Sequence, residues 1–448
     1  MIVRMTPLPL LQGLIAARKA RVGIIGLGYV GLPLAHAFHA AGFSVLGVDT
    51  DPAKPEAFRT GRPYLKHLGS AFDALAGNSR FEATTDHARL ADCDAILVTV
   101  PTPLDEHHVP DLSYVVKAAQ QIAAAMKAKP NKLVVLESTT YPGTTRREFL
   151  GPIAQALPGL ECGRDYFIGF SPEREDPGRV THTTAQIPKL VGGLDGPSME
   201  LAALLYEQAF TTVVRTESAE VAESAKLLEN IFRAVNIALV NEMKVVLGAM
   251  GVDVWQVIDA AASKPFGFMP FYPGPGLGGH CIPIDPFYLT YKAREFGQDS
   301  QLIELAGVIN TRMPRWVVER TAQALSDRGR PLKGARVCVL GLAYKADVDD
   351  VRESPALVII EELAARGARV DYSDPHVAAT HRMRRHDVRL KSVDLTPASV
   401  AGYDALVLVT GHAAFEYAMI AAHAKLVVDT RNRFSAHAAA MGDRLVKA

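Results

Sequence analysis

A glycine-rich turn near the start of the chain limits the possible folds most strongly. Gly26-Leu27-Gly28-Tyr29-Val30-Gly31 directly follows the apolar run RVGII and opens a helical pattern, LPLAHAFHAAG. This order predicts a strand, a tight turn and a helix of a parallel, helix-covered sheet. Further short apolar runs, such as DAILVTV and KLVVLE, alternate with helical patterns up to about residue 150. The first part of the chain is therefore predicted to be an α/β domain.

The same turn fits the G-x-G-x-x-G pattern of dinucleotide-binding sites. Gly26 permits the turn, Gly28 lets the backbone approach a pyrophosphate, and Gly31 lets the helix pack closely on the sheet. Asp49 ends the next predicted strand, where a carboxylate accepts the ribose hydroxyls of an adenosine and repels a 2′-phosphate. We therefore expect NAD rather than NADP as the cofactor, with a packing turn that binds no ligand as the alternative.

Two further patterns describe the rest of the chain. From Ser218 to about Met250 apolar residues recur three or four positions apart, and no Gly or Pro interrupts them before Gly248. This predicts one long helix, suited to joining two domains or pairing subunits. Beyond it, RVCVLGLAYK and ARVDYSDP repeat the strand, glycine turn and acidic strand end of the first domain in a degenerate form, with Ala343 in place of the second glycine.

Composition excludes several classes of function. The chain has 48 Lys+Arg against 48 Asp+Glu, and this zero net charge argues against a nucleic-acid-coating protein. No apolar run approaches the roughly 18 residues that cross a bilayer, so we expect no membrane span. The four cysteines are too scattered for a disulfide framework, which favours a reducing, cytoplasmic compartment. The histidines show no H-x-x-H grouping, so we predict no metal.

Cys281 is the cysteine most suited to chemistry. It lies in PFYPGPGLGGHCIPIDP, a loop rich in Gly and Pro, just before a predicted helix start that would stabilise a thiolate. Cys93 and Cys338 flank or occupy apolar strands and are interpreted as small buried residues. A thiol beside a nicotinamide can trap an aldehyde and permit a second oxidation. From spacing alone, a nucleophile and an inert cysteine are equally good interpretations of Cys281.

Several polar residues have two interpretations. Thr102 and Thr139 follow predicted strands, where their hydroxyls either touch a ligand or cap the next helix. Lys226 and Asn230 lie one turn apart on the long helix, and they either hold an oxyanion or form a solvated face, which composition alone favours. Glu173, in the charged loop SPEREDPG, is either a base or a solvated carboxylate.

Seven ordered motifs together resemble the UDP-glucose/GDP-mannose dehydrogenase family. They are GLGYVGLP, ESTTYPGTT, FSPERxxPG, AKLLEN, GLGGHCIPIDP, GLAYKxxxxDxRES and DTRN, and they extend over nearly the whole chain. The resemblance implies an α/β fold in which two Rossmann-like parallel-sheet domains are joined by a central helical domain with one long helix. The expected domains are 1–212 for NAD binding, 213–330 for dimerisation and the candidate cysteine, and 331–448 for UDP binding.

The resemblance also implies roles for individual residues. Cys281 is similar to the nucleophile that captures the C6 aldehyde of a nucleotide sugar as a thiohemiacetal, which is then oxidised to a thioester. Lys226 and Asn230 are similar to the pair that stabilises the oxyanion, which reverses the interpretation from composition. Asp285 is similar to the carboxylate that transfers protons together with Thr139 and water.

The remaining roles concern hydrolysis and binding. Glu173 is similar to the loop glutamate proposed as a base in thioester hydrolysis. The expected substrate contacts are Glu173, Lys226, Asn230, Tyr272, Gly278, Lys345 and Arg431. The expected cofactor contacts are Gly26, Gly28, Tyr29, Val30, Gly31, Asp49, Thr102, Thr139 and Arg352. The charged loop SPEREDPG and His280 before the cysteine depart from other members, which leaves sugar-ring contacts in that loop open.

The implied activity is a four-electron, NAD-dependent oxidation of the C6 alcohol of a UDP-sugar by a homodimer. The loop FGFMPFYPGPGLGGHCIPIDPFYL is most similar to that of UDP-N-acetylglucosamine 6-dehydrogenases of bacterial polysaccharide synthesis. UDP-glucose and UDP-N-acetylmannosamine are the alternative substrates. A two-electron 3-hydroxyacid dehydrogenase and a silent NAD-binding scaffold are the alternative functions, and counting NADH per product separates them from the favoured one.

Overall fold

The computed structural model describes residues 7–65, 68–105, 109–174, 184–279, 282–380, 383 and 386–448. The chain divides into two compact units, the first formed by residues 1–229 and 287–298 and the second by residues 230–286 and 299–448. None of the described helices has the length and apolar character needed to cross a membrane. His280 and Cys281 lie outside the described residues.

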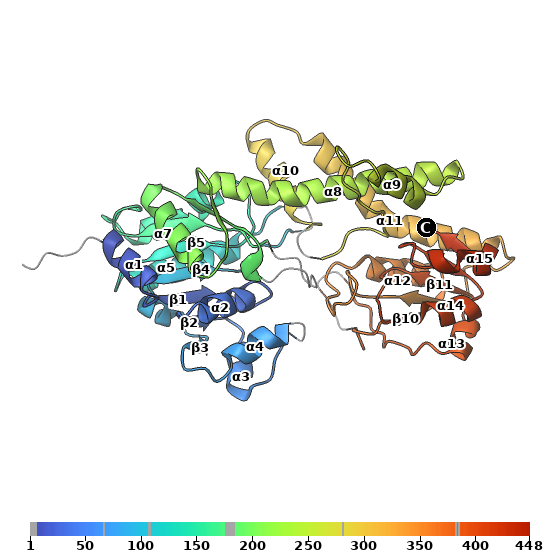
Figure 1. The fold of residues 1–448 in the computed structure, drawn as a ribbon, viewed down its shortest axis with the longest axis horizontal. Helices are drawn as coiled ribbons and strands as arrows, with labels where there is room; N and C mark the ends of the chain where they lie inside the picture. Colours follow the sequence, from blue (N-terminus) through green and yellow to red (C-terminus); the bar gives the residue numbers. More distant parts are fainter. Residues whose placement is uncertain are drawn as a thin grey trace, which may run out of the picture. The chain divides into compact units, whose positions relative to one another are not determined.

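The first unit is built on an eight-stranded sheet in the order β3-β2-β1-β4-β5-β6-β7-β8 (Figure 1). Its strands are β1 Arg21–Ile25, β2 Ser44–Val48, β3 Phe81–Thr84, β4 Ala95–Val98, β5 Leu133–Leu136, β6 Phe167–Phe170, β7 Lys189–Gly193 and β8 Val213–Arg215. Neighbouring strands are parallel except β6 and β7. The order 3-2-1-4-5-6 is that of a Rossmann fold, in which ligands bind at the carboxyl edge between β1 and β4.

Helices cover both faces of this sheet. Along β5, Leu133 and Val135 belong to one apolar cluster and Val134 and Leu136 to another, because side chains of a strand alternate between its faces. The first cluster also contains residues of α1 (Pro7–Ala16), α2 (Gly31–Ala40) and α7 (Gly196–Glu207). The second contains residues of α5 (Ser113–Met126) and α6 (Leu150–Ala156). The short helices α3 (Ala53–Thr60) and α4 (Gly69–Leu75) follow β2.

The second unit contains a five-stranded, wholly parallel sheet in the order β10-β9-β11-β12-β13. Its strands are β9 Arg336–Leu340, β10 Arg369–Ser373, β11 Ala405–Leu408, β12 Val427–Asp429 and β13 Leu445–Lys447. The helices that follow its strands are α12 Pro355–Ala365, α13 Pro397–Gly402, α14 Tyr417–His423 and α15 Ala438–Met441. The predicted fold class, two parallel-sheet α/β domains with a helical region between them in the chain, is confirmed.

The two sheets repeat the same turn after their first strand. Gly26 N donates to the carbonyl of the last residue of β2 at 2.8 Å, and Gly341 N donates to that of β10 at 2.8 Å. Leu27 N then donates to Asp49 Oδ2 at 2.7 Å, and Leu342 N donates to Asp374 Oδ2 at 2.6 Å. The second sheet is therefore a structural copy of the first at this turn, as the sequence predicts.

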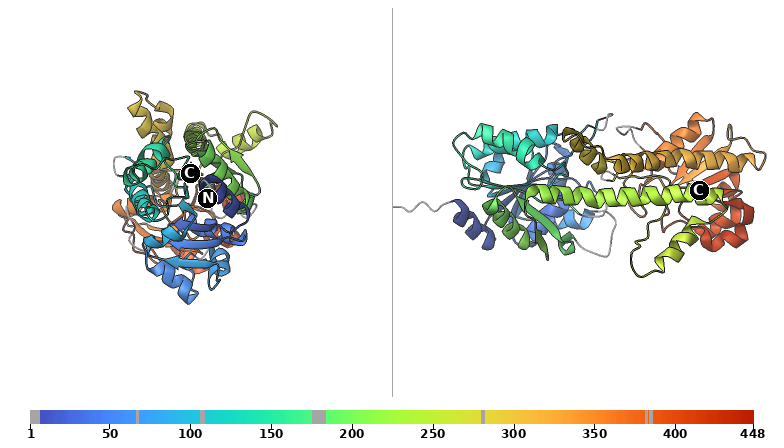
Figure 2. Two further views of the ribbon diagram at one scale, coloured as in Figure 1. Left: turned by 90° about the vertical axis from the view of Figure 1, so that its left-hand side faces the viewer. Right: turned by 90° about the horizontal axis from the view of Figure 1, so that it is seen from above.

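The long helix predicted from the apolar spacing is α8, which extends over Ala219–Ala249. Its second half runs beside α11 (Gln301–Ser326) within the second unit (Figure 2), where Asn310 Nδ2 donates to the Ala234 carbonyl at 2.9 Å. The helices α9 (Val254–Ala262) and α10 (Asp285–Glu295) follow α8 in the chain, separated by the loop that contains the candidate cysteine.

The predicted apolar stripe of α8 does not face the protein interior. Leu228 is 66% exposed and Leu239 is 54% exposed, and Phe232, Met243 and Val246 are exposed as well. Glu223, Lys226, Asn230, Asn241 and Lys244 are instead buried. Leu227, Ile231 and Val240 are buried as well, so α8 carries apolar residues on both sides and not in one stripe that faces the core.

Candidate active site

The glycine turn after β1 fits a dinucleotide. Gly26 has a φ of +95°, and a Cβ on Gly31 would lie 1.8 Å from the Gly26 carbonyl oxygen, so the fold itself requires both glycines. A Cβ on Gly28 would meet no protein atom within 4 Å, and its φ is not in the left-handed region. The space in front of Gly28 is therefore not filled by the protein. This agrees with the expected role of the second glycine, which lets the backbone approach a pyrophosphate.

Asp49 lies at the carboxyl end of β2, as predicted. Its Oδ2 accepts hydrogen bonds from Leu27 N at 2.7 Å and from Lys54 Nζ at 2.6 Å, and its Oδ1 accepts one from Asp51 N at 3.0 Å. Burial by itself would raise the pKa of Asp49, but Lys54 and the two backbone N–H groups outweigh it and lower the pKa. The carboxylate is therefore charged, and its remaining lone pairs can accept ribose hydroxyls.

The two threonines at the strand ends lie together. Thr102 Oγ1 donates to the Thr139 carbonyl at 2.9 Å, and Tyr288 Oη donates to the Thr102 carbonyl at 2.5 Å. The Thr102 hydroxyl thus connects the loops after β4 and β5 and caps no helix. Ser138 Oγ adds a bond to the Val100 carbonyl at 2.7 Å. The loops at the carboxyl edge of the sheet, next to the glycine turn, are consequently held to one another by hydrogen bonds.

Glu173 belongs to a buried ionic group that the sequence does not reveal. Lys189 Nζ donates to Glu173 Oε2 at 3.2 Å and to Glu137 Oε2 at 2.6 Å. Tyr206 Oη donates to the other oxygen of Glu137. Burial raises the pKa of Glu137, and Lys189 opposes this shift. The interpretation of Glu173 as a merely solvated carboxylate is therefore wrong, because Lys189 fixes it against a second, fully buried carboxylate.

Lys226 and Asn230 project from the buried side of α8, with exposed fractions of 7% and 8%. The interpretation of this side as a solvated helix face is therefore wrong. Asn230 Nδ2 donates to Asp285 Oδ2 at 2.5 Å, across 55 positions of sequence. Asp285 is 3% exposed and begins α10, so the structure brings together two of the residues that the resemblance assigns to catalysis.

The loop that follows Thr139 is held by another buried carboxylate. Glu223, one turn before Lys226 on α8, accepts hydrogen bonds from Gly143 N at 2.6 Å, Thr145 N at 2.9 Å and Thr145 Oγ1 at 2.7 Å. Burial raises the pKa of Glu223 to about 7. Sequence reasoning missed Glu223 and Lys189, although a lysine within an apolar strand such as PKLVGG is a usable signal of a buried ion pair.

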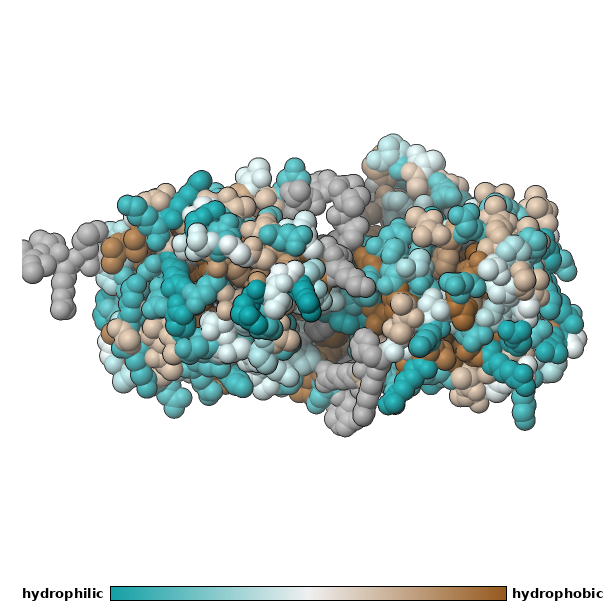
Figure 3. All heavy atoms as spheres, turned by 90° about the horizontal axis from the view of Figure 1, so that it is seen from below, coloured by the Kyte–Doolittle hydropathy of each residue, from teal (hydrophilic) through white to brown (hydrophobic). Residues whose placement is uncertain are grey.

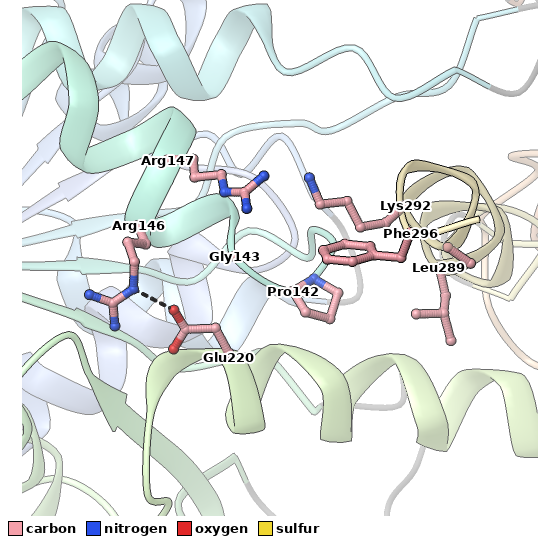
Figure 4. Close-up of a pocket in the computed structure, with 9 residues that line it drawn as sticks. Pro142, Gly143, Arg146, Arg147, Glu220, Leu289, Lys292 and Phe296 are labelled. Carbon is pink, nitrogen blue, oxygen red and sulfur yellow. Dashed lines mark hydrogen bonds and ion pairs between the residues drawn. The ribbon is translucent and has the colours of Figure 1, made fainter. Parts of the chain in front are cut away.

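A pocket of about 370 Å³ opens beside this loop (Figure 4). Pro142, Leu289 and Phe296 form apolar parts of its wall, and Arg147 and Lys292 point toward each other across it. Lys292 Nζ also forms an ion pair with Glu295 Oε2 at 2.7 Å. None of the lining residues is among those predicted for the site, so this pocket adjoins the loop that follows Thr139 without containing the predicted chemistry.

The second unit holds Asn230, Tyr272, Gly278, Lys345 and Arg431 of the expected substrate contacts, whereas Glu173 and Lys226 belong to the first unit. A Cβ on Gly278 would lie 2.6 Å from the Tyr344 Cβ, and Lys345 follows directly after that tyrosine. Arg431 Nε donates to the Val409 carbonyl at 3.0 Å. Tyr272 is half exposed, and its hydroxyl donates to Asp259 Oδ1 at 2.7 Å. The loop 270–279 and the ends of β9 and β12 thus present these side chains on one unit.

Arg352, expected to contact the cofactor, lies on the second unit. Its guanidinium binds both carboxylate oxygens of Asp350, with Nη2 at 2.6 Å from Oδ2 and Nε at 3.0 Å from each oxygen. Its carbonyl accepts a hydrogen bond from Gly279 N at 3.0 Å. Arg352 is therefore attached to the loop that leads to Cys281.

Two distant histidines meet a carboxylate, an arrangement that local spacing cannot reveal. Single ligand atoms of Asp347, His376 and His412 lie within 4.8 Å of one another. However, His412 Nδ1 accepts the Asp347 N–H at 2.9 Å, and His412 Nε2 is bonded to Asp374 Oδ2 at 3.0 Å. Both ring nitrogens of His412 are thus used within the protein, and the histidine offers no free ligand to an ion.

Comparison with known proteins agrees with this fold. Three models of the UDP-glucose/GDP-mannose dehydrogenase family match, namely its NAD binding domain at residues 20–210, its central domain at 220–312 and its UDP binding domain at 338–436. The UDP-N-acetyl-D-glucosamine 6-dehydrogenase of Pseudomonas aeruginosa is 37% identical over 89% of this chain and 92% of its own.

Two solved structures share the fold over most of the chain. The UDP-D-ManNAc dehydrogenase of Pyrococcus horikoshii superimposes with a TM-score of 0.83 at 32% identity, covering 92% of this chain and 95% of its own. A UDP-glucose dehydrogenase of Pyrobaculum islandicum gives a TM-score of 0.83 at 27% identity, covering 96% of each chain. The cofactor is NAD, and the chain belongs to the UDP-glucose/GDP-mannose dehydrogenase family, whose members are NAD-dependent oxidoreductases of nucleotide sugars.

Proposed function

We propose that the protein oxidises the C6 alcohol of UDP-N-acetylglucosamine to the uronic acid, releasing two NADH per product, for the synthesis of surface polysaccharide precursors in the cytoplasm. The observation that carries this proposal is the buried Asn230–Asp285 hydrogen bond of 2.5 Å, because it joins two groups of the family's chemistry in a chain with the family's cofactor turn. The N-acetylglucosamine assignment is supported by the Pseudomonas aeruginosa relative.

Each residue has a defined task in this proposal. NAD⁺ bound at the glycine turn supplies the hydride acceptor for each of the two oxidations. Cys281 attacks the C6 aldehyde after the first oxidation, and the resulting thiohemiacetal retains the aldehyde until it becomes a thioester. Lys226 and Asn230 stabilise the oxyanion. Asp285 transfers protons through water with Thr139.

Hydrolysis ends the sequence. A water molecule attacks the thioester carbonyl and gives one proton to Glu173, and the thiolate of Cys281 leaves. The carboxylic acid that forms loses its remaining proton to solvent and becomes the carboxylate. Lys189 supports this role because it keeps the Glu173 carboxylate in place at 3.2 Å. The loop 270–279, Lys345 and Arg431 hold the nucleotide sugar, and Arg352 contacts the cofactor.

The decisive test uses Cys281→Ser with UDP-N-acetylglucosamine and NAD⁺. We expect loss of uronic acid formation, because a serine hydroxyl does not retain the aldehyde as a thiolate does. The matched control is Cys162→Ser, which changes a half-buried cysteine bonded to Asp195 and should leave turnover intact. Full turnover in Cys281→Ser, or one NADH per product in the unsubstituted protein, would contradict the mechanism.

The identity of the sugar is tested by comparing UDP-N-acetylglucosamine with UDP-N-acetylmannosamine, UDP-N-acetylgalactosamine and UDP-glucose. These sugars differ at C2 or C4, and solved relatives are described as acting on different ones among them. We expect the highest kcat/KM for UDP-N-acetylglucosamine. A preference for UDP-glucose would show that the N-acetyl group is not recognised.

We also propose that a second copy of the chain covers the exposed apolar stripe of α8. Contiguous exposed apolar surface of this kind marks an interaction site, and a symmetric partner offers the same stripe. The face of the first unit viewed in Figure 3 is mainly hydrophilic, with apolar residues scattered among polar ones. Leu239→Arg should convert the dimer to a monomer in light scattering, and Lys127→Glu on an exposed helix end should not.

A further inference from the structure

Lys244 is a buried cation that the proposed mechanism does not use. It lies on α8 with 4% of its surface exposed, and its Nζ donates to the Gly274 carbonyl at 3.3 Å and lies 4.6 Å from the centre of the Trp316 ring. No carboxylate among the described residues is paired with it. An ammonium group buried without an anion is costly, so its presence calls for an explanation.

A second cation reaches the same loop residue. A Cβ on Gly274 would lie 2.4 Å from Arg431 Nη1, so a glycine is needed here for the guanidinium to approach the loop. Only Nε of that guanidinium makes a hydrogen bond to a described residue, the one to the Val409 carbonyl at 3.0 Å. Lys244 and Arg431 therefore converge on Gly274, and their mutual repulsion adds to the cost of burial.

Anchoring the loop does not explain the charge on Lys244. Gly274 N already donates to Asn241 Oδ1 at 2.9 Å, and Asn241 Nδ2 donates to Asn310 Oδ1 at 3.0 Å. These buried amides attach the loop to α8 and α11 without any net charge. A neutral donor at position 244 would hold the Gly274 carbonyl equally well and at lower cost, since buried polar groups need only a hydrogen-bond partner.

The other charges around Lys244 also favour an anion. Arg320, on α11, lies 5.9 Å from the same Trp316 ring. Asp429, before Arg431 in the chain, uses its carboxylate oxygens for the backbone N–H groups of Arg431 and Phe434, both at 2.8 Å. Lys244 thus shares Gly274 with Arg431 and the Trp316 ring with Arg320, and the carboxylate oxygens of Asp429 are already engaged.

We propose that Lys244 is a positioning residue for the diphosphate of the nucleotide sugar, which it attracts by its charge and by holding the Gly274 loop against Arg431. This inference rests on the proposed function, since it takes a UDP-sugar as the ligand. Arg431 lies in the segment matched by the UDP binding domain, whereas Lys244 lies in the segment matched by the central domain. The central helix therefore contributes to nucleotide binding.

The charge of Lys244 gives the binding a pH dependence. Burial, and secondarily Arg431, lowers the pKa of Lys244 to about 7 in the absence of ligand. A bound diphosphate favours the ammonium form, so UDP binding takes up a proton above this pKa. The affinity for UDP should fall as the pH rises above about 7, and Lys244→Arg, which stays charged, should remove most of this dependence.

The test compares UDP with uridine, which lacks the diphosphate, on the full chain. We expect Lys244→Met to weaken UDP binding at least tenfold at pH 7 by calorimetry, because a charge facing the diphosphate is lost. Uridine binding, followed by ligand-observed NMR, should not change. The melting temperature should stay the same or rise, since an unpaired buried charge is removed. Lys244→Arg should restore UDP binding, and Lys127→Met serves as the control.

Each alternative outcome is distinct. UDP affinity in Lys244→Met equal to that of the unsubstituted protein would overturn the inference. Equal losses for UDP and uridine together with a lower melting temperature would also overturn it, because they indicate a purely structural lysine. An unsubstituted protein that binds no UDP would overturn the proposed function itself, and NAD⁺ binding measured in parallel shows that the protein is folded.

Discussion

Two alanine substitutions in the glycine turn should affect different properties. Gly31→Ala should lower stability, because this glycine is needed for the fold, and Gly28→Ala should lower NAD⁺ affinity, because this glycine admits the cofactor. In Gly31→Ala the new Cβ would lie 1.8 Å from the Gly26 carbonyl oxygen, far inside the 3.0 Å below which Cβ contacts essentially do not occur. In Gly28→Ala the new Cβ would meet nothing within 4 Å. The protein alone therefore tolerates the second change and not the first.

The size of each effect follows from these contacts. Gly31→Ala has to displace backbone by more than 1 Å, which places it at or beyond the upper end of ordinary overpacking, about 3 kcal/mol. For a unit of this size that corresponds to a loss of roughly 6–12 °C in melting temperature. Gly28→Ala should change stability by no more than about 0.5 kcal/mol. Its methyl group would occupy the approach of the pyrophosphate, so NAD⁺ affinity should fall at least about tenfold.

Melting temperatures without NAD⁺ and dissociation constants for NAD⁺ by calorimetry test both effects. The matched control is Gly151→Ala at an exposed position of α6, where a Cβ meets nothing within 4 Å and the helix should gain about 0.5–1 kcal/mol. Unchanged NAD⁺ affinity in Gly28→Ala would refute the assignment of this turn to the cofactor. An unchanged melting temperature in Gly31→Ala would refute the steric reasoning.

Two further predictions concern buried charges. Glu223→Gln should lower the melting temperature by several degrees, because an amide cannot accept all three hydrogen bonds from Gly143 and Thr145, and a buried donor left unpaired costs about 1–3 kcal/mol. Burial raises the pKa of Glu223 from 4.5 to about 7, so between these pH values the native state holds a proton that the unfolded state has lost. The stability of the protein should therefore fall as the pH rises from about 4.5 to about 7. Calorimetric melting of Glu223→Gln over the same pH range should lack this part of the pH dependence. Lys189→Met removes the cation between Glu137 and Glu173, which should cost about 3–5 kcal/mol when both are charged. Protonation of a carboxylate relieves this loss, so thermal melts should show a larger destabilisation at pH 8 than at pH 6, and equal losses at both pH values would contradict it.

The sequence was sufficient where the determining contacts are local or strictly periodic. The turn at Gly26, the carboxylate at Asp49 and the long helix α8 follow from spacing, because a strand, a turn and a helix each impose a short repeat. The second copy of the turn follows by the same reasoning, and Asp374 takes the place of Asp49.

Pairs joined only by the tertiary fold could not be found in this way. Lys189 and Glu137 are 52 positions apart, and Asn230 and Asp285 are 55 apart. Sequence periodicity predicts which residues share a face of a helix or strand, but not which part of the protein packs on that face. Helical spacing singled out Asn230 together with Lys226, but only the family resemblance singled out Asp285, and no feature of the sequence paired Lys189 with Glu137. The solvated face favoured by composition for Lys226 and Asn230 is wrong for the same reason.

The buried charges and the exposed apolar stripe of α8 link the separate proposals. The inner face of α8 buries Glu223, Lys226, Asn230 and Lys244 beside apolar residues such as Leu227, Ile231 and Val240. Each buried polar group mainly recovers the cost of its desolvation, so this face contributes less than a wholly apolar one would. Packing of the outer apolar stripe adds stabilisation, because most helical stability in proteins comes from packing of apolar side chains. In the dimer that we propose, the partner supplies that packing. The inner face then carries the residues to which we assign polar roles, namely Glu223 for the loop after Thr139, Lys226 and Asn230 for the oxyanion, and Lys244 for the diphosphate.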